Sequence, residues 1–433
     1  MTTTSWAPLL SGPLAREAEE AVSHIATDLV RFATSGPTDS EGVPPRYPLV
    51  GLEGLAGIAL FLEFLDRSRG TAELGEAIGF ALGRATDELR EVQAHSGLHG
   101  GFSGLAWVVE HLQGRDPDPE DPGGAIAQQL FEHLAQAPWN RDYDLIGGLC
   151  GFGVWALERM PRPLGAESLA RVVRQLGELA LSVPEGLTWR TPRHLIPLHQ
   201  QHLFPDGNFN LGVAHGVPGV IAVLAEAYAM GVERPLAGRF LEQAVPWLLA
   251  QRLAPPSDSR FPFCVAPGFD PAPGGLAWCY GDLGISVALL GASRRVGRSD
   301  WEKEAIDLGL GVAARGLPDW SGTRQGDACL CHGAAGNGHL FNRLHRATGD
   351  ARFAEAAITW FKQALSLRNS EHGFGGFRFW DSDSEGNMTQ EPMLGLLNGS
   401  AGVGLALLAA TSDTEPVWDR LLLAAVPDSC EPV

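Results

Sequence analysis

Two cysteines and one histidine have the types and the spacing to bind a metal ion. Cys279 lies in the sequence Trp-Cys-Tyr-Gly-Asp-Leu-Gly, and Cys331 and His332 adjoin each other in Cys-His-Gly-Ala-Ala-Gly. Two thiolates and one imidazole suit Zn²⁺, and three protein ligands leave a fourth coordination position open, as is typical of catalytic zinc. The alternative is that both cysteines are small buried side chains beside a helix start, a common fate of free cysteine.

These residues belong to an element that repeats along the chain. A Gly-x-x-Gly sequence occurs seven times and each copy opens a run of apolar residues, while the segments between the runs are amphipathic with helical spacing. The first glycines of the seven loops are Gly54, Gly101, Gly148, Gly216, Gly281, Gly333 and Gly399.

The repeats predict an all-α fold, an α/α toroid of seven helical hairpins in a single domain over residues 1–433. Its apolar helices form an inner layer and its amphipathic helices an outer layer. Successive first glycines are 47 to 68 residues apart, which is too uneven for a regular open array. The glycine loops should gather at one end of the ring, so that Cys279 approaches Cys331 and His332.

One segment departs from the helical pattern. Residues 184–210 are rich in proline and predict a small extended or β-containing insertion over the rim of the ring. Three histidines lie in this segment, but Pro197 and Pro205 prevent a shared helical face, so a surface or substrate-contact role is favoured over metal binding. The three are His194, His199 and His202.

Composition and charge exclude several classes of protein. The 433 residues carry a net charge of −19 without a run of five basic residues, which argues against nucleic-acid binding. No stretch reaches 18 uncharged apolar residues, and the N-terminus lacks the features of a signal peptide, so a cytoplasmic protein without a transmembrane segment is expected. Six cysteines are too few for a disulfide scaffold of this length.

Three strings together resemble the lanthionine synthetase C family, the lanthipeptide cyclases. They are Asn-Leu-Gly-Val-Ala-His-Gly-Val-Pro-Gly (210–219), Trp-Cys-Tyr-Gly-Asp-Leu-Gly (278–284) and Cys-His-Gly-Ala-Ala-Gly-Asn-Gly (331–338). The resemblance implies one Zn²⁺ per chain, held by Cys279, Cys331 and His332. Because no dehydratase-sized region precedes the toroid, the chain resembles the stand-alone class I enzyme.

The resemblance also implies partners and a place in the cell. The substrate would be a dehydrated lanthipeptide precursor with leader and core regions. A complex with a dehydratase and an exporter would bring this cytoplasmic protein to the membrane periphery.

The implied reaction needs an activated thiol and an acid. A cysteine thiol, with a pKa of about 8.5, must become a thiolate before it attacks the β-carbon of dehydroalanine or dehydrobutyrine. The enolate that forms must then be protonated at Cα. His215 matches the family's His-Gly motif and Asp144 the family's Asp, and the sequence leaves open which of them is the general acid or base. As alternatives, His215 is a helix-start histidine bonded to backbone, and Asp144 is a helix N-cap.

Other candidate residues lie near the proposed metal ligands in the sequence. Trp278 and Tyr280 flank Cys279 and either wall the pocket or hydrogen-bond an intermediate, although aromatic packing alone also explains them. Cys329 should point away from the metal if it shares extended backbone with Cys331. Gly275 stands where some class I members have an arginine, and candidates to replace that arginine are Arg190, Arg193 and Arg378.

Two other functions fit parts of the pattern. One is a different zinc thiol-alkylating enzyme on an α/α barrel, similar to the β-subunits of protein prenyltransferases, which use an Asp, Cys and His set. The other is a non-catalytic scaffold that binds zinc or glutathione. Mass spectrometry with a dehydrated peptide separates the cyclase from both.

Overall fold

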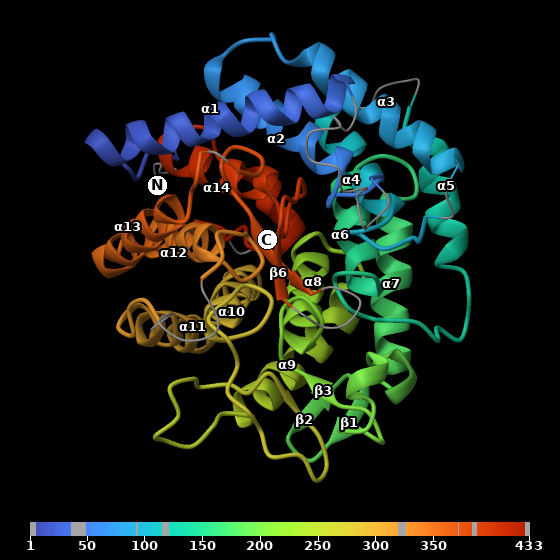
Figure 1. The fold of residues 1–433 in the computed structure, drawn as a ribbon. Helices are drawn as coiled ribbons and strands as arrows, with labels where there is room; N and C mark the ends of the chain where they lie inside the picture. Colours follow the sequence, from blue (N-terminus) through green and yellow to red (C-terminus); the bar gives the residue numbers. More distant parts are fainter. Residues whose placement is uncertain are drawn as a thin grey trace. The chain divides into compact units, whose positions relative to one another are not determined.

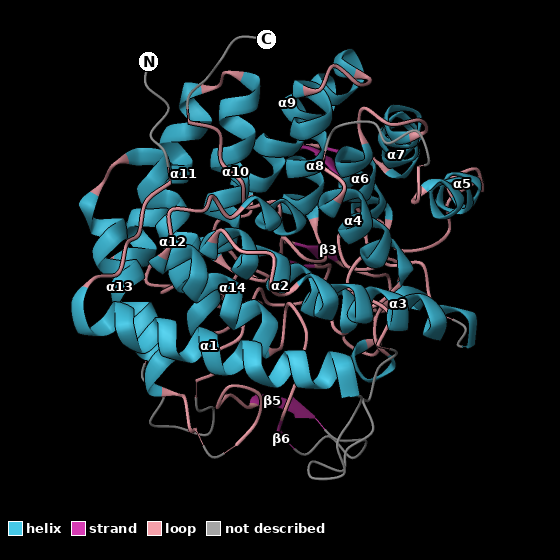
Figure 2. Ribbon diagram, turned by 90° about the horizontal axis from the view of Figure 1, so that it is seen from above, coloured by secondary structure: helices cyan, strands magenta, loops and turns pink. Residues whose placement is uncertain are grey.

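The structure is a computed structural model that describes residues 6–35, 49–91, 94–114, 121–318, 326–370, 372–382 and 388–428. In these residues helix is the dominant element, as Figure 2 shows. The α-helices are α1 (Gly12–Ser35), α2 (Leu55–Arg69), α3 (Gly75–Glu91), α4 (Phe102–Leu112), α5 (Gly124–His133), α6 (Leu149–Arg159), α7 (Gly165–Leu179), α8 (Val217–Ala229), α9 (Arg234–Ala250), α10 (Asp282–Val296), α11 (Ser299–Ala313), α12 (Ala334–Thr348), α13 (Ala351–Ser366) and α14 (Ser400–Thr411).

The even-numbered helices follow the glycine loops, and most of them are buried around much of their circumference. In α14 every residue from Ser400 to Ala410 is buried, and in α8 every residue from Val217 to Ala225. A helix that is apolar on all sides needs neighbours on all sides, which is the environment of an inner layer. No helix in the described part of the chain is long and apolar enough to cross a membrane.

Odd-numbered helices bury one face only. In α7 the buried residues include Leu169, Val172 and Leu176, at the spacing of a single helical stripe. Four inner helices pack on the helix that follows them in sequence, α2 on α3, α6 on α7, α8 on α9 and α12 on α13, whereas α14 packs on α1 (Figure 1). The hairpin therefore runs from an inner helix to an outer one, whereas the glycine loop joins one hairpin to the next.

The chain forms two compact units. The first contains residues 1–108 and 313–418, and the second residues 109–312 and 419–433. Within the first unit, α14 packs against α1, α2 and α12. Within the second, α8 packs against α6 and α10, so each unit has inner helices that contact one another directly.

The described strands form three antiparallel pairs. The pairs are β1 (Leu181–Val183) with β2 (Gly186–Thr188), β3 (Phe209–Asn210) with β4 (Cys264–Val265), and β5 (Phe379–Ser382) with β6 (Met388–Glu391). The expected extended character of residues 184–210 is confirmed, with two short 3₁₀ turns at Arg193–Leu195 and Leu198–Gln200. The hairpin begins at Leu181, slightly before the predicted segment. Its place over the rim stays a prediction.

Gly281, the N-cap residue of α10, occupies a position that excludes any side chain. Its φ is +127°, and a Cβ atom there would lie 1.7 Å from the carbonyl oxygen of Gly275. Both the backbone conformation and the close approach therefore require glycine. Cys279 and Tyr280 are the two residues that directly precede this turn.

We expect Gly281→Ala to lower the free energy of unfolding by at least about 1–3 kcal/mol, because the alanine must hold a strained φ and displace Gly275. Gly147→Ala is the matched control, since a Cβ at this loop glycine meets nothing within 4 Å and its φ is not positive. Thermal unfolding measures both variants. Equal midpoints for Gly281→Ala and Gly147→Ala would contradict this assignment.

Candidate functional site

The candidate residues share a register relative to the helix starts. The N-cap residues of α8, α10 and α12 are Gly216, Gly281 and Gly333. Cys279 and Cys331 stand two residues before such a glycine, and His215, Tyr280 and His332 stand directly before one. Equivalent loop positions thus hold most of the side chains that the sequence singled out.

His215 and Asp144 form a hydrogen-bonded pair in the second unit. His215 Nδ1 lies 2.6 Å from Asp144 Oδ2, and the other carboxylate oxygen of Asp144 accepts the Gly147 backbone N–H at 2.9 Å. Asp144 is buried, whereas 42% of the His215 side chain is exposed. With Nδ1 bonded to the carboxylate, Nε2 is the ring atom that can exchange a proton.

The surroundings of Asp144 shift the pKa values of two nearby side chains, His215 and Asp142. Burial lowers the pKa of His215, but the hydrogen bond and charge of Asp144, with the charges of Cys279 and Asp142, raise that pKa above its ordinary value. Burial and the neighbouring charge of Asp144 raise the pKa of Asp142 to about 6. The second unit therefore concentrates groups that can exchange protons near neutral pH beside the start of α8.

Tyr280 stacks on the same imidazole. The Tyr280 and His215 rings are 5.9 Å apart at 25°, and the Tyr280 hydroxyl accepts a hydrogen bond from Asn210 Nδ2 at 2.8 Å. Burial raises the pKa of the phenol to about 12, so it remains protonated at neutral pH. Its own proton is not used in the bond from Asn210, which leaves Tyr280 able to donate.

Asn210 is a residue that the sequence analysis did not single out, although it opens the string that contains His215. Its side-chain oxygen accepts the Gly212 backbone N–H at 2.8 Å. A second contact joins the insertion to the third glycine loop, since the Tyr143 hydroxyl donates to the Trp189 carbonyl at 3.2 Å. The segment 184–210 is thus fastened at two points to the loops that carry Asp144 and Tyr280.

Trp278 and Cys279 differ in exposure. Trp278 is 2% exposed and its indole N–H donates to the Leu422 carbonyl at 2.9 Å, which supports the packing role rather than contact with an intermediate. Cys279 is half-buried, and its carbonyl accepts the Ala214 backbone N–H at 3.4 Å. The fourth and fifth loops are therefore joined through backbone atoms beside His215.

Cys331 and His332 lie in the first unit, directly before α12. Cys331 is half-buried and His332 is exposed, and the Cys331 N–H donates to the Leu397 carbonyl at 2.9 Å. The thiol of Cys331 and the imidazole of His332 are side chains of the kinds that bind zinc. With Cys279 they are candidate metal ligands, whereas His194, His199 and His202 belong to no such group among the described residues.

Asp327 and Cys329 lie four and two residues before Cys331 in the same loop. The ligand atoms of Asp327, Cys329 and His332 lie within 4.8 Å of one another. Asp327 accepts the Cys329 N–H at 2.7 Å with one oxygen and the Trp380 N–H at 3.0 Å with the other, and Cys329 Sγ accepts the His332 N–H at 3.5 Å. Burial raises the pKa of the Cys329 thiol to about 11. These bonds give both side chains a role in shaping the loop.

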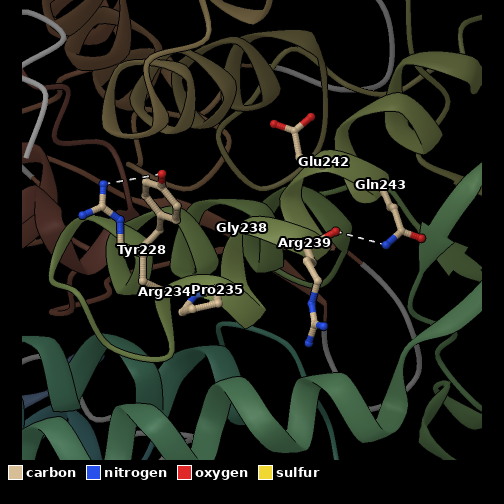
Figure 3. Close-up of a pocket in the computed structure, with 7 residues that line it drawn as sticks. All are labelled: Tyr228, Arg234, Pro235, Gly238, Arg239, Glu242 and Gln243. Atoms are coloured by element: carbon tan, nitrogen blue, oxygen red, sulfur yellow. Dashed lines mark hydrogen bonds between the residues drawn. The ribbon is translucent and has the colours of Figure 1, made fainter.

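A hollow of 510 Å³ lies in the second unit. It is lined by residues from the end of α8 and the first half of α9, including Tyr228, Arg234, Arg239 and Glu242 (Figure 3). Arg234 lies over the Tyr228 ring, 4.5 Å from its centroid, and Glu242 pairs with Arg298. Two of its charged groups are thus already paired, and it contains none of the candidate site residues.

Comparison with known proteins finds one matching family model and several solved structures with a similar fold. The model of the family described as lanthionine synthetase C-like protein matches residues 50–423, a range that includes every candidate site residue. Among solved structures, nisin cyclase is 18% identical with a TM-score of 0.69, over 94% of this chain and 97% of that one. Cellobiose 2-epimerase from Bacillus thermoamylovorans B4167 is 12% identical with a TM-score of 0.50, over 90% and 98% of the two chains.

The two structural likenesses concern the fold. They confirm the α/α toroid that the glycine repeats predict. Since a cyclase and a sugar epimerase both resemble the chain, the fold by itself does not select a reaction. That selection rests on the residues before the inner helices.

Proposed function

The chain belongs to the lanthionine synthetase C-like family, and on that premise we propose that it is a zinc-dependent lanthipeptide cyclase. Its substrate would be a precursor peptide with leader and core regions, in which Ser and Thr have been dehydrated. The observation that carries the proposal is the His215–Asp144 pair, held at a helix start next to the backbone of Cys279. A binding scaffold would not need this oriented imidazole.

The proposed ligands are Cys279, Cys331 and His332, with one Zn²⁺ per chain. Zinc bound there would supply Lewis acidity that favours the thiolate form of a peptide cysteine. Two cysteines and one histidine fit this ion in softness, and the half-buried and exposed positions of the three residues leave access for a fourth ligand.

The proposed reaction is an addition with no net oxidation or reduction. The peptide thiol loses its proton, and its sulfur forms a C–S bond to the β-carbon of dehydroalanine or dehydrobutyrine. The electron pair of the carbon–carbon double bond moves onto the amide as an enolate, and Cα then takes up one proton. The product is a lanthionine or methyllanthionine ring.

His215 is the residue we propose for proton transfer. Asp144 fixes the ring through Nδ1 and stabilises its protonated form, so that Nε2 can deliver a proton to Cα. Asp144 then acts through His215 rather than on the substrate. Tyr280 stacks on the imidazole and is the second candidate donor, because its hydroxyl keeps its own proton.

The Asp327, Cys329 and His332 group has the donor set of the prenyltransferase-like alternative. We favour the Cys-Cys-His set because both oxygens of Asp327 and the sulfur of Cys329 already accept backbone N–H groups. Metal binding there would have to replace these bonds. Family membership supports the same choice.

We therefore expect Cys329→Ala to retain one zinc per chain, since it removes a single weak hydrogen bond to the loop and no proposed ligand. Metal analysis of the purified variant beside wild type measures this. Loss of zinc from Cys329→Ala together with its retention in Cys331→Ala would assign the metal to the Asp-Cys-His group instead.

The cellular setting follows from this function. We propose that the protein acts in the cytoplasm and meets its precursor in a complex with a dehydratase and an exporter at the membrane periphery. An excess of acidic residues, with a net charge of −19, favours basic partners.

The test of function uses a dehydrated peptide with free cysteines. Ring formation does not change the peptide mass, so the free thiols are counted by alkylation with N-ethylmaleimide before mass spectrometry. A cyclase converts a peptide that takes up one adduct per cysteine into one that takes up none. Unchanged adduct numbers with a zinc-loaded protein would instead support the zinc- or glutathione-binding scaffold.

A further inference from the structure

The carboxylate of Glu53 joins two glycine loops of the first unit. Glu53 directly precedes Gly54, the N-cap residue of α2. One carboxylate oxygen accepts the Leu397 backbone N–H at 2.9 Å, and the other accepts the Asn398 backbone N–H at 3.3 Å. Both donors belong to the loop before α14, so one side chain holds two consecutive peptide groups of a loop 344 residues away in sequence.

The same loop carries Cys331. The Leu397 N–H points to Glu53, and the Leu397 carbonyl accepts the Cys331 backbone N–H at 2.9 Å. A displacement of Leu397 is therefore passed to Cys331 through a single residue. The connection consists of Glu53, Leu397 and Cys331, all within one unit.

Backbone packing makes this arrangement specific. The Leu396 N–H donates to the Leu52 carbonyl at 2.9 Å, parallel to the side-chain bonds of Glu53. At Gly395 a Cβ would lie 2.3 Å from Glu53 Cα, so the two backbones are in direct contact. The Glu53 N–H also donates to the His99 carbonyl at 3.2 Å, which fixes the residue from its other side.

Glu53 occupies the loop position that elsewhere carries His215, Tyr280 and His332. In the first loop this position holds a carboxylate that is turned to backbone donors, with only 22% of its side chain exposed. Burial raises the pKa of Glu53 to about 7 although both backbone bonds lower it. The carboxylate satisfies two backbone N–H groups that an apolar residue in its place would leave without an acceptor.

We propose that Glu53 is a positioning residue that fixes the loop of Leu397 and thereby the place from which Cys331 ligates zinc. The inference rests on the proposed zinc site. It assigns Glu53 no contact with substrate or metal. Its effect should therefore be seen first in metal affinity and in the geometry of the metal site.

The experiment compares Glu53→Ala and Glu53→Gln with wild type and with Glu88→Ala. Glu88 is the matched control, because its carboxylate accepts the Leu49 backbone N–H at 3.0 Å in the same unit but has no hydrogen bond to the Leu397 loop. Zinc affinity is measured by competition with a chromophoric chelator. The absorption bands of the Co²⁺-loaded proteins report the geometry of the metal site.

Glu53→Ala should weaken zinc binding by about tenfold or more, the lower end of the range for residues that support metal ligands. Glu53→Gln keeps one acceptor but turns an amide N–H₂ toward the second backbone donor, so a smaller loss and shifted Co²⁺ bands are expected. This variant preserves size and serves if Glu53→Ala does not fold. Glu88→Ala should bind zinc as wild type does.

Two results are decisive against the inference or its premise. Wild-type zinc affinity and Co²⁺ bands in both Glu53 variants would remove the positioning role while leaving the zinc site in place. An equal loss of affinity in Glu88→Ala would reduce the effect to general destabilisation and overturn the inference as well. Absence of zinc binding by the wild-type protein would instead overturn the proposed function.

Discussion

Cys279→Ala and Cys331→Ala are expected to lose their zinc and nearly all cyclisation activity while keeping a helical fold. Each substitution removes one of three proposed ligands, and two ligands do not hold a catalytic zinc ion. The fold should persist because the backbone hydrogen bonds of both residues do not involve the sulfur atoms: the Cys279 carbonyl accepts from Ala214, and the Cys331 N–H donates to Leu397. Metal analysis, circular dichroism and the rate of thiol loss from a dehydrated peptide measure the three effects.

Cys264→Ala is the matched control for these variants. Cys264 is buried beside Ile196 and Phe204 and lies outside the proposed ligand set. It should retain one zinc per chain and its activity. Stoichiometric zinc in both Cys279→Ala and Cys331→Ala would remove the proposed site.

His215→Ala should keep its zinc and lose activity by about 10²–10⁴-fold, the usual effect of removing a general acid or base. The side chain is partly exposed and is no proposed ligand, so neither fold nor metal should depend on it. Asp144→Ala should also retain zinc, and its activity should fall because His215 loses the partner of its Nδ1 atom. Zinc content and cyclisation rate are measured on the same samples.

His24→Ala, which changes an exposed histidine on α1, controls for the loss of a histidine as such and should behave as wild type. Loss of zinc from His215→Ala would make this residue a ligand or the support of one. Full activity in His215→Ala would move the proton donor to Tyr280, Asp144 or water.

The fold was predictable because its signals are local. Each glycine pair precedes an apolar run, and close approaches such as that of Gly281 to Gly275 explain why glycine is required there. The order within a hairpin was less evident from sequence. Inner helices such as α12 and α8 pack on the outer helix that follows them, and this depends on short turns such as the one between α12 and α13 rather than on the glycine loops.

The site was predictable in its residue types but not in its contacts. His215 and Asp144 are 71 residues apart, and only the packing of α6 and α8 brings their side chains within 2.6 Å. The indole of Trp278 finds its acceptor at Leu422, 144 residues away. No periodicity in the sequence encodes such pairings.

Glu53 was overlooked because a glutamate before a helix looks like an ordinary surface residue. The available signal was its register, since it stands directly before a first glycine as His215 and His332 do. Only the structure shows that its carboxylate is turned to the Leu397 and Asn398 backbone.

Zinc-dependent cyclisation is tested most directly by a zinc titration of the metal-free protein, with the rate of free-thiol loss from a dehydrated peptide as the measured quantity. The rate should rise in proportion to added zinc and stop rising at one equivalent per chain. A metal-free protein that forms rings as fast as the loaded one, or a fully loaded protein that leaves every peptide thiol free, would contradict it.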